Sequence, residues 1–212
     1  MSFAVLWDLD GTLADTAADI ALTVNEMLAE FGLATLPEAR VRAHVGAGAK
    51  QLVDRCVVDV GGTPAPEQVR WFMDRYRAFP QRLSAIFPGM AALVADVTVP
   101  QAIVTNKPAG VSDALLRALE LRAPFAVLVG GDTLPQRKPD PEPLRYAMAQ
   151  LGVTEAVMVG DGPHDVHGAR AAGVPVIGVA WGMGDPAGAD RVVRDADELR
   201  EALAGYGAFR YR

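Results

Sequence analysis

The first fifteen residues constrain the fold of this 212-residue chain more than any other stretch. Residues 3–7 (FAVLW) form an apolar run with β-branched and aromatic members, which predicts a buried parallel strand. The run stops at Asp8 and continues as Asp-Leu-Asp-Gly-Thr. Asp8 and Asp10 would stand at the carboxyl end of the strand, where open α/β sheets bind ligands. Two like charges this close cost free energy unless a cation or a shared proton offsets them, so the pair indicates a functional site.

Apolar strand patterns alternate with helical patterns over the second half of the chain. The expected strands cover residues 101–105, 125–129, 156–159, 174–179 and 192–193. Strands that alternate with helices predict a parallel sheet with right-handed crossovers and helices on both faces. We therefore expect an α/β fold with a Rossmann-like, doubly wound parallel sheet.

Four helical patterns follow one another between residues 16 and 80, with no strand pattern between them. The second of these helices is expected to begin at Thr35, because Thr-Leu-Pro-Glu is typical of a capping box with Pro in the first turn. The fourth is expected to begin at Pro66. We interpret residues 16–80 as an inserted all-helical cap domain, and residues 1–15 and 81–212 as the catalytic core.

Polar side chains recur just beyond the expected core strands. Parallel strands share one direction, so these groups emerge at the same edge of the sheet as Asp8. A lysine, Lys138, lies in a loop that opens a helix next to this edge. The side chains that we expect to converge there are Asp8, Asp10, Thr105, Asn106, Lys107, Lys138, Asp161 and Asp165.

These residue types suit phosphoryl transfer. A carboxylate that approaches a phosphate ester is repelled by roughly 4 kcal/mol for unit charges about 4 Å apart at an effective dielectric of about 20, so cations must offset the charge. Asp8 and Asp161 offer the hard oxygen ligands that Mg²⁺ prefers. Lys138 adds a positive charge, while Thr105 and Asn106 offer neutral donors for phosphoryl oxygens. The set is complete for hydrolysis through an aspartyl phosphate.

The same motifs resemble those of the haloacid dehalogenase superfamily phosphatases. The matched positions are Asp8 to Thr12, Thr105 with Asn106, Lys138, and Asp161 with Asp165. The resemblance implies that Asp8 is the nucleophile, that Asp10 is the acid and base, and that Lys138 is catalytic. It also implies a Mg²⁺ site formed by Asp8, the backbone carbonyl of Asp10, Asp161 and Asp165, although Asp165 is favoured as a more distant acid or as the partner of Lys138.

Four further segments are similar to bacterial phosphoglycolate phosphatases, which hydrolyse 2-phosphoglycolate to glycolate and phosphate with Mg²⁺. They are residues 42–48, 105–108, 130–132 and 138–141. The similarity implies a small phosphorylated metabolite as substrate. The implied substrate-binding residues are Thr105, Asn106, Lys107, Gly46 and Gly48.

Several side chains have two interpretations at this point. Lys107 either contacts substrate or belongs to the solvated surface. Arg42, His44 and Lys50 flank the glycine turn of the cap, and each either meets a substrate carboxylate or is an exposed helix residue.

Other functions use related parts. A phosphatase of another small metabolite, such as N-acetylmuramate 6-phosphate or a nucleotide, would share the whole core. A sugar phosphomutase keeps both Asp8 and Asp10 but returns the phosphoryl group to its substrate. A receiver domain, which is a signalling switch, is disfavoured because its acidic pair and its phosphorylated Asp lie on different strands.

Composition limits the partners and the compartment. The formal net charge of −6 disfavours nucleic acid. No apolar run approaches the roughly 18 residues of a membrane span. A single cysteine, Cys56, suits a reducing compartment. We therefore expect a cytoplasmic protein, as a monomer or homodimer, with no membrane partner.

Overall fold

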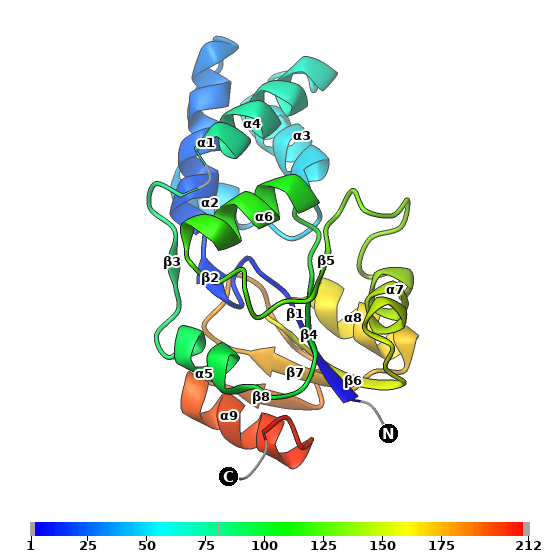
Figure 1. The fold of residues 1–212 in the computed structure, drawn as a ribbon. Coiled ribbons are helices and arrows are strands. Elements are labelled where there is room, and N and C mark those ends of the chain that lie inside the picture. Colours follow the sequence, from blue (N-terminus) through cyan, green and yellow to red (C-terminus); the bar gives the residue numbers. More distant parts are fainter. Residues whose placement is uncertain (1–2, 80, 210–212) are drawn as a thin grey trace.

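The central sheet contains six parallel strands in the order β5-β4-β1-β6-β7-β8 (Figure 1). The computed structural model describes residues 3–79 and 81–209. β1 lies in the middle, between β4 and β6, and the sheet confirms the expected parallel α/β fold. The strands are β1 (Phe3–Trp7), β4 (Gln101–Val104), β5 (Val127–Val129), β6 (Glu155–Gly160), β7 (Val176–Val179) and β8 (Arg191–Val193).

Helices cover both faces of the sheet. α5 (Met90–Asp96), α6 (Ala109–Ala118) and α9 (Ala196–Gly205) pack on one face, and α7 (Glu142–Leu151) and α8 (Pro163–Ala172) pack on the other. Side chains of β1 alternate between the two cores. Val5 and Trp7 belong to the first, and Ala4 and Leu6 to the second. Burial on both faces explains why the strand sequence is apolar throughout.

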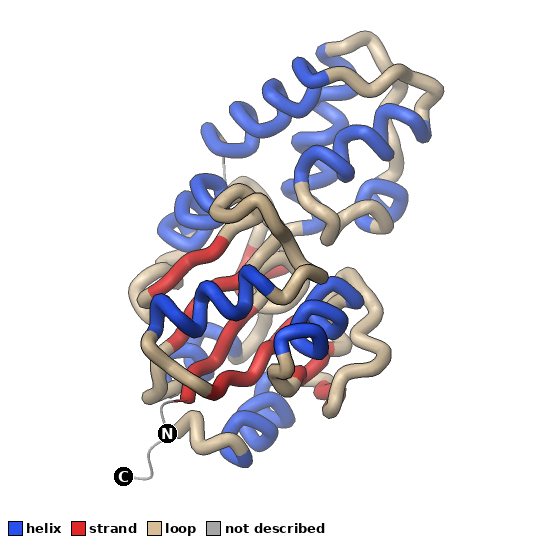
Figure 2. The backbone as a smooth tube through the Cα atoms, turned by 90° about the vertical axis from the view of Figure 1, so that its right-hand side faces the viewer, coloured by secondary structure: helices blue, strands red, loops and turns tan. Residues whose placement is uncertain are grey.

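The helical insertion stands apart from the sheet and has its own apolar core (Figures 1 and 2). It contains α1 (Ala17–Glu30), α2 (Glu38–Arg42), α3 (Ala49–Asp59) and α4 (Pro66–Ala78). Val111 of α6 joins this core, so the insertion packs on one core helix. The expected insertion is confirmed, and the boundaries at residues 16 and 80 stay a prediction.

The second cap helix begins at Glu38, and the start expected at Thr35 is wrong. Leu36 is held away from helical conformation by Asn25, whose side chain accepts from the Leu36 N–H at 2.8 Å and donates to its carbonyl at 2.9 Å. Leu36 also precedes Pro37, and the residue before proline avoids the α region. Both effects place the helix start beyond the capping-box pattern.

Two features lie outside the elements expected from the sequence. A two-stranded antiparallel ribbon pairs β2 (Ala14–Asp15) with β3 (Ala85–Ile86) where the chain leaves and re-enters the core. Two-residue strands are too short to show a periodicity. The second feature is helix α9, whose start does have a sequence signal, an N-cap aspartate. The Asp195 side chain caps the helix by accepting from the Glu198 N–H at 2.8 Å.

The chain segment that returns from the cap is fastened to α1 by Asp19. This fully buried carboxylate accepts hydrogen bonds from the backbone N–H groups of residues 82–84 at 2.7 to 3.2 Å, and from the Ser84 hydroxyl at 2.5 Å. Burial raises the pKa of Asp19, but the hydrogen bonds from Ser84, Leu83 and Arg82 outweigh it, so the net pKa is lowered. Residues 82–84 are therefore fixed to α1 of the cap.

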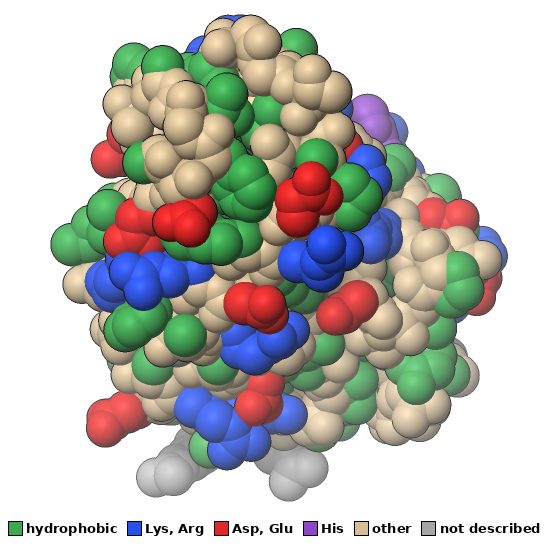
Figure 3. Space-filling model, turned by 90° about the horizontal axis from the view of Figure 1, so that it is seen from above, with side chains coloured by type: hydrophobic (Ala, Val, Ile, Leu, Met, Phe, Trp, Pro, Cys, Tyr) green, Lys and Arg blue, Asp and Glu red, His purple; other side chains and the backbone are tan. Residues whose placement is uncertain are grey.

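One face of the molecule carries charged side chains of both signs. Seen from above, basic and acidic side chains are interspersed over the visible face (Figure 3). Among the helices of the described ranges, none has the length and apolarity needed to cross a bilayer.

We predict that Asp19→Asn lowers the free energy of unfolding at pH 7 by about 2 kcal/mol, because hydrogen bonds to a buried charge are lost. Since the native pKa of Asp19 is lowered, its contribution is present above the unfolded pKa of about 3.9 and is lost as pH falls through the native value. Urea unfolding of both proteins from pH 7 to pH 3 should show the difference shrinking below about pH 4.

Asp74→Asn is the matched control, because this α4 side chain is 77% exposed. It should change stability by less than about 0.5 kcal/mol. An Asp19→Asn deficit of equal size at pH 7 and pH 3 would contradict the assignment.

Candidate active site

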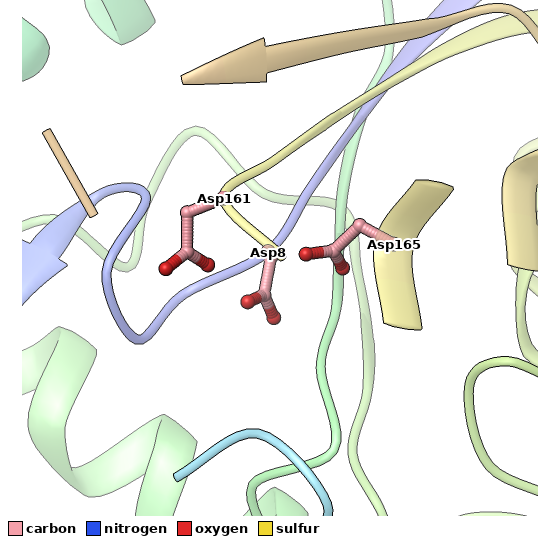
Figure 4. A group of neighbouring side chains, drawn as sticks. All are labelled: Asp8, Asp161 and Asp165. Atoms are coloured by element: carbon pink, nitrogen blue, oxygen red, sulfur yellow. The ribbon is translucent and has the colours of Figure 1, made fainter. Parts of the chain in front are cut away.

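Three carboxylates converge at the point where the strand order of the sheet reverses. Asp8 follows β1 and Asp161 follows β6, the strand beside it, while Asp165 lies in the first turn of α8. One oxygen from each lies within 4.8 Å of the others, and all three residues are buried. Figure 4 shows Asp8 and Asp161 side by side, with the Asp165 carboxylate turned toward Asp8. Such a switch point is where open α/β sheets bind ligands.

Lys138 lies between two of these acids. Its Nζ donates to Asp8 Oδ1 at 2.9 Å and to Asp165 Oδ1 at 2.5 Å. The second oxygen of Asp165 accepts from the Gly162 N–H at 3.1 Å, so both oxygens of this acid have protein partners. One ammonium group thus serves two carboxylates.

Asp161 is held by backbone groups instead. Its Oδ2 accepts from the N–H groups of Met183 and Gly184 at 2.7 and 2.9 Å, in the loop that follows β7. Gly11 packs against the same oxygen with φ of 82°, and a Cβ on Gly11 would lie 2.3 Å from it. Glycine after the two acids is therefore required both by the turn and by this close approach.

The acidic cluster holds three carboxylates against the single ammonium of Lys138. Burial raises the pKa of Asp8 to about 7, with repulsion from Asp165 and Asp161 adding to the effect and Lys138 opposing it. Burial, followed by repulsion from Asp165, raises the pKa of Asp161 to about 6. A cation held by carboxylate oxygens would relieve both costs, and hard oxygen donors fit a divalent ion such as Mg²⁺. The donor set therefore fits a metal site.

The Asp10 side chain lies outside this cluster. It accepts from the Thr16 hydroxyl at 2.8 Å and from Lys107 Nζ at 2.9 and 3.2 Å. Lys107 is buried and also donates to the Tyr76 hydroxyl of α4 at 2.9 Å, so its interpretation as solvated surface is wrong. Burial lowers the pKa of Lys107, but the Asp10 charge and the contacts with Tyr76 together outweigh it, so the pKa is raised. Lys107 therefore joins the proposed acid and base to a cap helix.

Asn106 connects the cap loop to the core. Its amide donates to the Gly46 carbonyl at 2.9 Å and to the Lys138 carbonyl at 2.8 Å. Gly46 has φ of 113°, a backbone conformation that other residues rarely adopt. Thr105 accepts from the Lys107 N–H at 3.2 Å. The turn after β4 is thus held by its own side chains.

All site residues proposed from the sequence line one cavity of about 350 Å³ between core and cap. The core contributes Asp8, Asp10, Thr105, Asn106, Lys107, Lys138, Asp161 and Asp165, and the cap loop contributes Gly46 and Gly48. Further cap residues on the lining are Ile20, Arg42, Leu52, Arg55, Phe72, Met73 and Tyr76.

Of the three polar cap residues that flank the glycine turn, one lines the cavity and two do not. His44 contacts Asp59 at 2.6 Å and Lys50 pairs with Asp54 at 2.5 Å, and neither lines the cavity. Arg42 does line it and donates to the Gly182 carbonyl at 2.7 Å. Sequence reasoning missed Arg55. Its signal was helical spacing, since Arg55 lies three residues after Leu52 on the same face.

Curated relatives match the chain over most of its length. The phosphoglycolate phosphatase of Rhodospirillum rubrum is 41% identical, with 86% of this chain and 81% of that protein covered. The plasmid-borne phosphoglycolate phosphatase of Cupriavidus necator is 42% identical, with 91% of this chain and 87% of the relative covered.

Solved structures and a family model agree with this likeness. The crystal structure of CbbY from Rhodobacter sphaeroides in complex with phosphate has a TM-score of 0.82 at 29% identity, covering 94% of this chain and 96% of that one. The model of the haloacid dehalogenase-like hydrolases matches residues 5–179. With the Asp8 turn, Lys138 and Asp161 brought together beneath a helical insertion, this chain belongs to the haloacid dehalogenase-like hydrolase family.

Proposed function

We propose that this protein is a Mg²⁺-dependent phosphatase that hydrolyses 2-phosphoglycolate to glycolate and phosphate. The carrying observation is the buried cluster of Asp8, Asp161 and Asp165 with Lys138, placed at the sheet's switch point and enclosed by a cap. Relatives named phosphoglycolate phosphatase at 41% and 42% identity support the choice of substrate.

Asp8 attacks phosphorus and the ester P–O bond breaks, which forms an aspartyl phosphate. Asp10 donates a proton to the leaving alkoxide. Asp10 then takes a proton from the water that attacks the aspartyl phosphate, and phosphate and free Asp8 result. Lys138 holds Asp8 and offsets its charge, while Lys107 holds the Asp10 side chain in place through its ion pair.

The proposed metal ligands are the side chains of Asp8 and Asp161 and the backbone carbonyl of Asp10. Asp165 forms an ion pair with Lys138, and we propose this contact as its role. When bound, Mg²⁺ supplies positive charge against the phosphoryl oxygens and the carboxylates. The Thr105 hydroxyl is proposed to donate to the phosphoryl group from the turn after β4. The donor role expected for the Asn106 side chain is not kept, because its amide already donates to the Gly46 and Lys138 carbonyls. Gly46 and Gly48 of the cap loop and Lys107 of the core line the cavity, and these residues are proposed to contact the rest of the substrate.

Asp8→Asn should lower kcat by at least about 10³-fold, because an amide oxygen cannot form the acyl phosphate. Phosphate release from 2-phosphoglycolate measures the loss, and far-UV circular dichroism checks that the fold is retained. Residual activity above about 1% in a folded variant would exclude Asp8 as the nucleophile.

Mg²⁺ should raise the melting temperature of the wild-type protein, since a ligand at about 100 times its Kd stabilises the native state by about 2.7 kcal/mol. Asp161→Asn should remove most of this shift, because one of the three clustered carboxylates is lost. Asp185→Asn is the matched control, because Asp185 lines the same cavity outside the cluster. Equal shifts in all three proteins would place the metal elsewhere.

Wild-type protein with Mg²⁺ should prefer 2-phosphoglycolate in kcat/KM by about 100-fold, or about 2.7 kcal/mol, over sugar phosphates, nucleotides and an aryl phosphate. Phosphate release across this panel tests the substrate. A higher value for a sugar phosphate such as N-acetylmuramate 6-phosphate would replace 2-phosphoglycolate, and transfer back to the sugar without phosphate release would indicate a mutase.

A further inference from the structure

The cavity contains four cationic side chains, and they differ in what they already bind. Lys138 is shared by Asp8 and Asp165, and Lys107 pairs with Asp10. These two lysines are therefore committed to the carboxylates of the core. The remaining two cations are arginines of the cap, Arg42 and Arg55.

The two arginines have different partners. Arg42 Nη2 donates to the Gly182 carbonyl at 2.7 Å, which ties the cap to the core loop that also holds Asp161. Arg55 Nη2 donates to the neutral side-chain amide of Gln51 at 3.1 Å. Within residues 3–79 and 81–209, Arg55 takes part in no ion pair. A guanidinium group has five N–H donors, so most of its capacity is open to a ligand.

Arg55 is exposed to solvent and lines the cavity from the cap. It shares a face of α3 with Leu52, and both line the cavity. On the opposite wall lies His164, beside Asp165. Burial is the largest cause of the lowered pKa of His164, and the positive charge of Arg55 contributes, which places this charge within electrostatic range of the core wall.

We propose that Arg55 is a specificity-determining residue that binds the carboxylate of the substrate, an inference that rests on the proposed function. The phosphoryl group of 2-phosphoglycolate is directed to the core by Asp8 and Lys138, so its carboxylate is left on the cap side. On the cap side, the substrate carboxylate needs a cationic side chain that is not already paired with an acid. Arg55 is such a side chain. Guanidinium and carboxylate groups match as a two-point hydrogen-bonded pair.

The test compares two substrates that differ only in the proposed group. 2-Phosphoglycolate carries a carboxylate where 2-hydroxyethyl phosphate carries a hydroxymethyl group. Arg55→Gln should raise KM for 2-phosphoglycolate by about 10- to 100-fold, the usual range for loss of a hydrogen bond to a charged group. Its kcat/KM for 2-hydroxyethyl phosphate should stay within about twofold of wild type, since no carboxylate is present.

Lys50→Gln is the matched control, because it removes one positive charge from the same helix at a side chain that is 70% exposed and away from the cavity. It should leave both substrates unchanged. Arg55→Lys should recover part of the loss, as the charge remains without the planar fork.

The outcomes separate the two proposals. If wild type prefers 2-phosphoglycolate and Arg55→Gln keeps that preference, the role of Arg55 is overturned while the proposed function stands. If Arg55→Gln weakens both substrates equally, Arg55 is structural and the inference also fails. If wild type does not prefer 2-phosphoglycolate over 2-hydroxyethyl phosphate, the proposed substrate fails, and the carboxylate role fails with it.

Discussion

Repulsion among buried carboxylates at the ends of β1 and β6 is the constraint on which the rest of the site depends, because other groups must offset it. Burial and neighbouring acids raise the pKa of Asp8 and of Asp161, and a single ammonium, that of Lys138, serves Asp8 and Asp165. The cost is sustained because β1 is central in a sheet with apolar cores on both faces, which leaves these side chains little freedom to separate. The cluster is thereby prepared for a cation and for an anionic substrate.

The turn after β4 connects this chemistry to the cap. Asn106 binds the carbonyl of Gly46, and Lys107 joins Asp10 to Tyr76 of α4. The cap also holds the chain segment that returns to the core, because Asp19 of α1 accepts a hydrogen bond from the Ser84 N–H. A change in the position of the cap would therefore move Tyr76 and alter the contact between Lys107 and Asp10. This arrangement explains how one core chemistry can be combined with recognition by a separate set of cap residues.

Much of this could be predicted from local patterns. Apolar runs that stop at Asp8 or Asp161 identified strand ends, and the four helical periods identified the insertion. The errors have physical causes. Thr35 failed as a helix start because Asn25, which lies eleven residues before Leu36, binds Leu36. Lys107 was ambiguous because its partners, Asp10 and Tyr76, are far from it in the chain. The ribbon of β2 and β3 is too short to produce a pattern.

Local sequence patterns are enough to identify the groups that reach the catalytic edge, because parallel strands share a direction and their ends therefore lie together. Which charges neutralise one another depends on the three-dimensional packing of the chain. Lys138 and Asp8 are 130 positions apart, and Lys107 and Asp10 are 97 apart. Such pairs depend on strand order and on where the cap packs. The spacing of apolar residues along a single helix or strand contains no information about either. The same reason separates Lys50, paired on the surface, from Arg55, which faces the cavity five residues later.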